Sequence, residues 1–141
     1  MLKLLCMGLT ALVGLAGCSK SATPPPNPYA ALLIAGPWQP YSDYAVATPT
    51  GGSPSTSFGG LSAPGTTVDY RADGTLLIKY VSPYPSELGT YTLAGAALTT
   101  TVSGRPPYTR TIRVLTANRL ELDSDSELAG YRYVGTSTLV R

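Results

Sequence analysis

The sequence has no histidine, and its two cysteines, Cys6 and Cys18, both lie close to the N-terminus. The rest of the chain therefore lacks the usual general base at neutral pH, the nucleophilic thiol and the best zinc ligands. Ser/His/Asp and Cys/His catalytic sites are excluded, and no glycine-rich phosphate loop follows a strand and opens a helix. We predict that the protein is not an enzyme and uses neither a cofactor nor a metal.

Charged residues are also scarce, at 13% of the chain. One of the ten Lys/Arg, Lys3, precedes the first apolar segment, so nine cations face eight anions in the remainder. This balance leaves no basic stripe to concentrate against phosphates, and we predict no nucleic-acid partner. Four arginines crowd one region but alternate with apolar residues, and we interpret them as a solvated sheet face. They are Arg105, Arg110, Arg113 and Arg119.

The sequence also lacks an apolar run long enough to span a membrane. The run at residues 4–14 is well short of the ~20 residues that a spanning helix needs, and no second run follows. Lys3, this run and the small residues after it have the layout of a signal peptide, which we assign to residues 1–17.

Leu15-Ala16-Gly17-Cys18 resembles the bacterial lipobox, in which the cysteine thiol receives a thioether-linked diacylglycerol. The resemblance implies a lipoprotein acylated on Cys18, with palmitate-like chains that hold it stably at a membrane. Ser19 replaces the Asp that favours inner-membrane retention, so we expect a cell-envelope protein anchored at the outer membrane. The alternative is an ordinary signal peptide with an incidental Cys18. Because Cys6 is removed with the signal peptide and Cys18 carries the lipid, we expect no disulfide in the exported domain.

The proline cluster at residues 23–28 can form neither helix nor sheet and favours extended polyproline II. We predict that residues 18–30 are a disordered, stiff tether. Residues 31–141 are enough for one hydrophobic core and too few for two. We therefore expect one domain after the tether.

Runs rich in Thr, Val, Tyr, Leu and Ile recur about every ten residues between turn signals from Trp38 onward, which is an all-β pattern. Turns at Asp73-Gly74, Ala94-Gly95 and Ala117-Asn118 favour antiparallel hairpins. Because a meander of this size usually closes, we predict an eight-stranded antiparallel up-and-down β-barrel. The predicted strands are residues 38–47, 66–71, 75–81, 89–93, 98–102, 109–116, 120–124 and 131–140.

Alternation along these strands separates an inward face from an outward face. The inward set is Tyr91, Leu93, Leu98, Thr100, Val102, Ile112, Val114, Leu120, Leu122, Tyr131 and Tyr133. The outward set includes Thr99, Thr101, Thr111, Arg113, Glu121 and Arg132.

Gly36-Pro37-Trp38 matches the G-x-W that opens the first strand of lipocalins. Short phrases at residues 73–75, 89–93 and 115–122 are similar to those of small bacterial lipocalin-like lipoproteins. The resemblance covers most of the chain after the tether and implies a lipocalin-like barrel. In that family the tryptophan plugs the closed end beneath an arginine of the last strand. Trp38 is therefore the predicted plug, and Arg132 or Arg141 its partner.

The connections sort by length between the two ends of the predicted barrel. The tight turns and the start of the first strand share one end, while the loops at residues 48–65, 82–87, 103–108 and 125–130 share the other. Recognition is expected at the long-loop end. Tyr84 and Tyr108, beside prolines, are either ligand contacts or a lid. Phe58 lies in a loop without a strand pattern, either disordered or plugging the mouth.

Three carboxylates, Asp123, Asp125 and Glu127, lie close together after the seventh predicted strand. A catalytic carboxylate pair or a calcium site is conceivable there, but the spacing is not that of an EF-hand loop. We interpret these residues as a solvated turn.

We predict a membrane-anchored binding module for a small apolar or amphipathic ligand. Small inward residues (Gly89, Thr100, Gly135 and Ser137) favour a hollow barrel, whereas the inward tyrosines favour a filled one. The alternative is a solid barrel that docks an envelope protein or a polysaccharide through its loops. The candidate ligand-binding residues are Tyr84, Tyr108, Phe58, Tyr91, Ile112, Leu122, Tyr131 and Tyr133.

Overall fold

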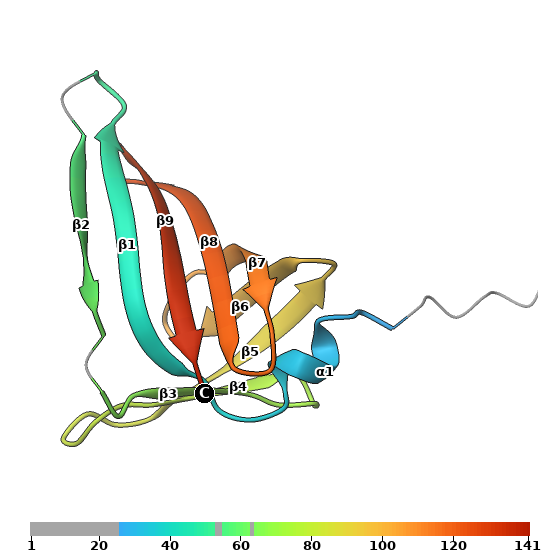
Figure 1. Ribbon diagram of the computed structural model, residues 1–141. Coiled ribbons are helices and arrows are strands. Elements are labelled where there is room, and N and C mark those ends of the chain that lie inside the picture. Colours follow the sequence, from blue (N-terminus) through green and yellow to red (C-terminus); the bar gives the residue numbers. More distant parts are fainter. Residues whose placement is uncertain (1–25, 53–54, 63) are drawn as a thin grey trace, which may run out of the picture.

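The computed structural model describes residues 26–52, 55–62 and 64–141. These residues form one short helix and nine antiparallel strands of a single sheet (Figure 1). The elements are α1 (Ala30–Leu33), β1 (Gln39–Pro49), β2 (Thr56–Leu61), β3 (Thr67–Tyr70), β4 (Thr75–Lys79), β5 (Glu87–Ala94), β6 (Ala97–Val102), β7 (Tyr108–Leu115), β8 (Arg119–Leu128) and β9 (Tyr131–Val140). The strand order is β2-β1-β9-β8-β7-β6-β5-β4-β3.

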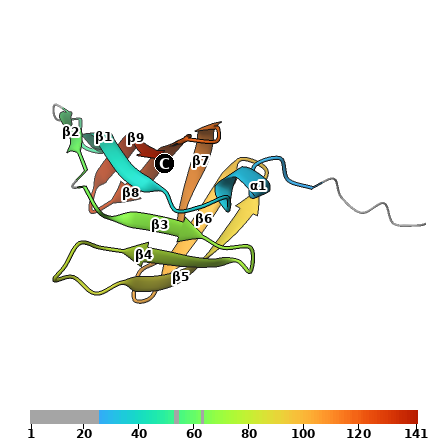
Figure 2. The same cartoon turned by 60° about the horizontal axis from the view of Figure 1, so that its bottom comes forward.

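The sheet closes at one end only. Just before β1, Trp38 exchanges two backbone hydrogen bonds with Val68 of β3, with N···O distances of 2.8 and 2.7 Å. Away from this closure β1, β9 and β8 continue upward with β2 on the free edge, while β3 and β4 cross the base (Figures 1 and 2). The molecule is therefore a half-barrel, closed at the end where α1 and the C-terminus lie.

The all-β antiparallel prediction is confirmed, but the sheet has nine strands rather than eight. The additional strand, β2, lies within residues 48–65, which we predicted to be a loop. All six residues of β2 are exposed, so the strand carries no apolar alternation that its sequence could reveal. Phe58 consequently lies on a strand opposite Ala45, and its assignment to a loop was wrong.

The predicted loop at residues 125–130 is also corrected. β8 continues to Leu128, and only Ala129 and Gly130 turn the chain into β9, both with positive φ (51° and 80°). Positive φ at the two central residues is the requirement of a tight hairpin turn. Asp125 and Glu127 therefore lie on a strand rather than in a turn.

A β-bulge changes the predicted alternation in β7. The pairing with β8 shifts between Ile112 and Val114, so that Leu115 lies opposite Leu120 and packs against the core. Because one extra residue exchanges the two faces of a strand, Val114 lies opposite Glu121 instead of facing inward.

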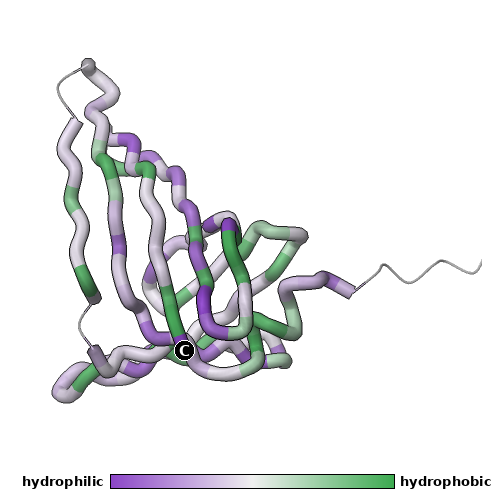
Figure 3. Tube along the Cα trace, in the orientation of Figure 1, coloured by the Kyte–Doolittle hydropathy of each residue, from purple (hydrophilic) through white to green (hydrophobic). Residues whose placement is uncertain are grey.

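The hydrophobic core fills the closed end, where the apolar parts of α1 and of the end of β9 meet (Figure 3). We call the side of the sheet that carries this core the inner face. Hydrophobic burial there supplies the main driving force for folding. The buried residues are Leu33, Trp38, Tyr70, Leu76, Leu98, Ile112, Leu120, Leu122 and Leu139.

The described chain begins within the predicted tether, and residues 26–30 are held against the domain rather than disordered as we predicted. Asn27 donates a side-chain hydrogen bond to the Gly95 carbonyl (3.0 Å), and Tyr29 packs against the core. The predicted signal peptide, Cys18 and residues 18–25 of the tether lie outside the described residues. Across the described ranges, no helix has the length and apolar character needed to cross a membrane.

Candidate functional site

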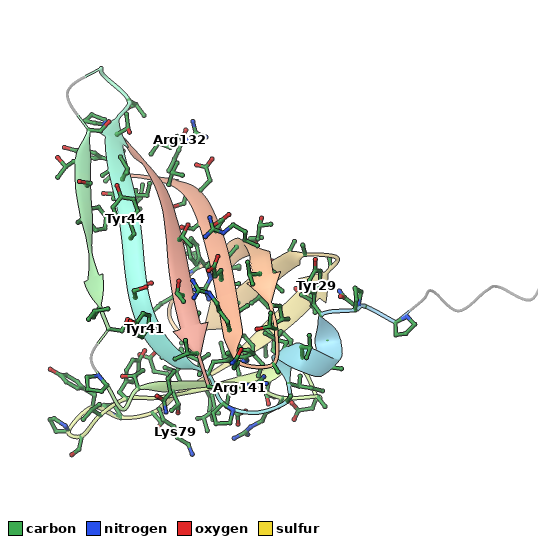
Figure 4. The ribbon with its side chains drawn as sticks, in the orientation of Figure 1. Tyr29, Tyr41, Tyr44, Lys79, Arg132 and Arg141 are labelled. Carbon is green, nitrogen blue, oxygen red and sulfur yellow. The ribbon has the colours of Figure 1, made fainter. Side chains whose placement is uncertain are left out.

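Trp38 and Arg141 seal the closed end of the half-barrel. Trp38 is fully buried, and its Nε1 donates to the Leu33 carbonyl oxygen (2.9 Å). The Arg141 guanidinium lies 3.8 Å from the centroid of the Trp38 ring, and Nη1 donates to the Ala117 carbonyl (3.0 Å). Arg132, the other predicted partner of Trp38, lies at the opposite end, where it pairs with Asp125 (Figure 4).

A cavity of about 220 Å³ lies inside the half-barrel, above this seal. Strands β1, β3, β4, β6, β7 and β9 all contribute to its wall. Its apolar wall includes Val68, Leu76, Ile78, Val102 and Leu139. We call this space the polar cavity, because its lining also includes the polar residues Asp43, Tyr70, Thr100, Arg110, Ser137 and Thr138.

Tyr70 lines the polar cavity, and its hydroxyl is buried and unpartnered among the described residues. Its side chain is 1% exposed and packs edge-to-face against Tyr91, with ring centroids 5.2 Å apart. Within residues 26–52, 55–62 and 64–141, no group meets the distance and angle limits of a hydrogen bond with this hydroxyl, although the Arg110 side chain approaches its oxygen. Burial raises the pKa of Tyr70, and the neighbouring Arg110 opposes part of that rise, first through its positive charge and then through its polar contact with the phenol oxygen. The phenol is therefore neutral and a hydrogen-bond donor at physiological pH.

Arg110 brings a second unpartnered donor. Its Nε is buried and makes no hydrogen bond to any described residue. The guanidinium lies 5.7 Å from the centroid of the Tyr108 ring, which is 40% exposed. A buried donor without a partner costs roughly 1–3 kcal/mol, so two of them in one cavity require an explanation.

Sequence reasoning placed Arg110 on a solvated face, and this was wrong. The other three arginines of that group do lie at the surface, where Arg113 and Arg119 pair with Glu121 and Arg105 pairs with Glu87. Arg110 differs because it shares a strand face with Ile112, which we had assigned inward. That alternation was the signal that could have identified it.

An aromatic cluster formed by Phe58, Tyr131 and Tyr133 lies farther from the seal on the inner face. Phe58 and Tyr133 meet edge-on with centroids 6.3 Å apart, and Tyr131 lies 6.2 Å from Tyr133. Tyr131 and Tyr133 alternate with Leu139 along β9, which places them on the core side of the sheet. Three of the predicted ligand-binding residues are therefore brought together.

Small residues connect the aromatic cluster to the polar cavity. Gly135 lies midway on β9 between Ser137 and Tyr133, opposite Ala45 of β1 and Ser124 of β8. A Cβ at Gly135 would lie 2.5 Å from the Tyr44 carbonyl oxygen, so this position accepts only glycine. On β1, β9 and β8 the inner face thus carries no large side chain in the row between the two groups of residues.

The other candidate ligand-binding residues have different surroundings. Tyr84 is 71% exposed and lies beside Tyr80, away from the polar cavity. Ile112 and Leu122 belong to the closed-end core. Tyr91 supports Tyr70, and its hydroxyl donates to the Arg71 carbonyl (2.7 Å).

The outer face carries paired charges. Glu121 is only 6% exposed, because Arg113 and Arg119 cover it, so the prediction that it faces water is corrected. Hydrogen bonds from Arg113 and then Arg119 lower the pKa of Glu121. Asp125 pairs with Arg132, and Asp123 accepts a hydrogen bond from Thr136. In the part of the chain that the structure describes, no cluster of three or more potential ligands could hold a metal ion.

No protein-family model matches the sequence, and neither the curated proteins nor the solved structures contain a match.

Proposed function

We propose that the protein is a lipid-anchored, lipocalin-like envelope protein that binds a small amphipathic ligand on the inner face of its half-barrel. The observation that carries this proposal is the polar cavity, in which Tyr70 and Arg110 keep buried donors without partners. Binding sites typically combine apolar walls with a few converging polar groups. The aromatic cluster supplies apolar contact surface on the same face.

The closed end also favours the lipocalin resemblance. Trp38 of the G-x-W phrase is buried there and stacks against an arginine that directly follows the last strand. This pairing is the one that the resemblance implied. It supports a common architecture and says nothing about the identity of the ligand.

The lipobox-like residues around Cys18 support the anchor. Asn27 contacts Gly95 at the closed end, so a tether from Cys18 would hold the closed end toward the membrane. The aromatic cluster would then face away from the lipid surface. We therefore propose the outer membrane as the location and the lipid on Cys18 as the means of attachment.

Native mass spectrometry of the full chain, expressed in a bacterium and extracted from its envelope, tests both parts. We expect loss of residues 1–17, acyl mass on Cys18, and a further noncovalent mass that denaturation removes. Cys18→Ser should abolish the acyl mass and keep the noncovalent one. A clean apo mass that persists after incubation with amphipathic compounds would contradict ligand binding.

One observation favours docking as a second function. β2 is an exposed edge strand that pairs only with β1 among the described residues. Such an edge can accept a strand from a partner. A photo-crosslinking residue at Ser57 would then give one defined adduct in living cells, whereas no defined adduct would count against docking.

A further inference from the structure

We infer that the polar cavity receives the carboxylate head group of a singly charged amphipathic ligand, whose apolar tail follows the inner face to the aromatic cluster. This inference rests on the proposed binding function and names its ligand class. It is carried by the donors, the charges and the dimensions of the site.

The donors select a negatively charged acceptor. Arg110 and Tyr70 both line the polar cavity, and each keeps a buried donor atom without a partner among the described residues. A carboxylate has two oxygens and can accept from both groups at once. An alcohol would accept more weakly, and an ammonium group would have to lie beside the guanidinium.

The charges favour a single negative charge over two. Asp43 lines the same cavity, and its Oδ2 accepts a hydrogen bond from Ser62 (3.3 Å). Within the described residues Arg110 forms no ion pair with Asp43 or with any other carboxylate. The single guanidinium can balance one incoming charge, whereas the repulsion from Asp43 is about twice as large for a phosphate dianion as for a monoanion.

The dimensions require the ligand to extend beyond the cavity. A volume of about 220 Å³ is smaller than the roughly 300–1,000 Å³ of sites that enclose a whole drug-sized ligand. Ser137 at the cavity and Tyr133 in the aromatic cluster are four residues apart along β9, which corresponds to roughly 13 Å of strand. On β1, β9 and β8 the residues between them on the inner face are Ala45, Gly135 and Ser124, and Phe58 of β2 lies at the end of the same row. A tail about that long would reach Phe58 and Tyr133.

Isothermal titration calorimetry of the full chain, in a non-ionic detergent with a detergent blank, tests the head group. The probes share one tail and differ in charge: decanoate, decanol, decylammonium and decyl phosphate. We expect decanoate to bind most tightly. Asp43→Asn should strengthen the binding of decyl phosphate by removing the opposing charge.

Variants separate the head from the tail. Arg110→Met should weaken decanoate binding by about tenfold or more and leave decanol unchanged, because a charge-assisted hydrogen bond is lost. Tyr70→Phe keeps the ring that packs on Tyr91 and should cost about fivefold. Phe58→Ala should weaken decanoate and decanol equally. Arg132→Met is the matched control, since it removes an outer-face arginine that is 57% exposed.

A merely structural role for Arg110 would give a different result. If the donors are kept for a ligand, Arg110→Met and Tyr70→Phe should unfold at the same temperature as wild type or higher while losing decanoate. Parallel loss of stability and binding would overturn the inference.

The remaining outcomes distinguish this inference from the proposed function. Equal binding of decanoate and decanol, unaffected by Arg110→Met, would refute the head-group assignment and leave amphipathic binding standing. Tighter binding of decyl phosphate than of decanoate would refute the carboxylate. If no probe binds the wild type, both proposals are wrong.

Discussion

The closed end and the polar cavity of this half-barrel each hold an arginine, and the two guanidinium groups differ in their hydrogen bonding. Arg141 at the closed end stacks on Trp38 and donates to backbone carbonyls, including that of Ala117. Arg110 in the polar cavity contacts one tyrosine ring and keeps its Nε without a partner among the described residues. The closed end therefore satisfies its polar groups, and the cavity does not.

The difference indicates that the two regions of the sheet contribute differently to the stability of the fold. Stability resides where Trp38, Leu33 and their neighbours are fully buried and hydrogen-bonded. Under the proposed function, the polar cavity would lose some stability by keeping donors unpartnered, as expected of a preorganised binding site. If this division holds, substitutions at the two regions should shift stability in opposite directions.

The largest expected effect is at the plug. Trp38→Ala should lower the free energy of unfolding by about 3–5 kcal/mol, because it removes a fully buried aromatic ring and leaves a cavity. Urea unfolding followed by circular dichroism measures this loss. Tyr84→Ala, at a side chain that is 71% exposed, is the control and should leave the midpoint unchanged.

Arg141→Met should have the next largest effect. It removes the stacking on Trp38 and the hydrogen bonds to the Leu32 and Ala117 carbonyls, at a cost of about 1–2 kcal/mol. Arg141→Lys keeps the charge but not the planar fork, and should recover only part of that loss. Full recovery by lysine would show that charge alone matters at this position.

A pair of hydroxyl deletions sharpens the comparison further. Tyr70→Phe removes an unpartnered buried hydroxyl and should stabilise the protein by about 1 kcal/mol. Tyr91→Phe removes a hydroxyl that donates to the Arg71 carbonyl and should destabilise by about 1 kcal/mol. Thermal unfolding of the two variants shows whether each substitution raises or lowers the stability. The same sign for both would contradict the division between the regions.

The smallest effect is expected on the outer face. Arg113 and Arg119 hold the pKa of Glu121 below its ordinary value of 4.5, so its ionised form stabilises the folded state. That contribution is complete well above pH 4.5 and is lost as the pH falls through the lowered pKa. Glu121→Gln should therefore be less stable than wild type at neutral pH, with a difference that shrinks in acid. Urea midpoints across this range would show it, and a constant difference would contradict it.

Most of the fold could be predicted from the sequence because the alternation of apolar residues and the turn residues agree from Thr66 onward. The prediction failed where that signal is absent. β2 buries none of its residues, and the β7 bulge inserts a residue that alternation alone cannot detect. The end of β8 was missed because Asp125 and Glu127 were interpreted as turn residues rather than as the polar face of a strand.

The candidate site was predicted in part. Tyr131, Tyr133 and Phe58 were candidates, and the structure places them in one cluster. Arg110 and Tyr70 were not, because a charged residue in a strand is usually solvated and a tyrosine is usually satisfied. Only the closure of the sheet places both of them around one cavity, which depends on contacts between residues far apart in the sequence.

The most direct test of the account is a crystal structure of the protein with a bromine-terminated decanoate, located by its anomalous signal. We predict the carboxylate within roughly 2.7–3.2 Å of Arg110 Nε and the Tyr70 hydroxyl, and the bromine beside Phe58 and Tyr133. A ligand bound with its carboxylate in solvent, or on the outer face, would contradict it.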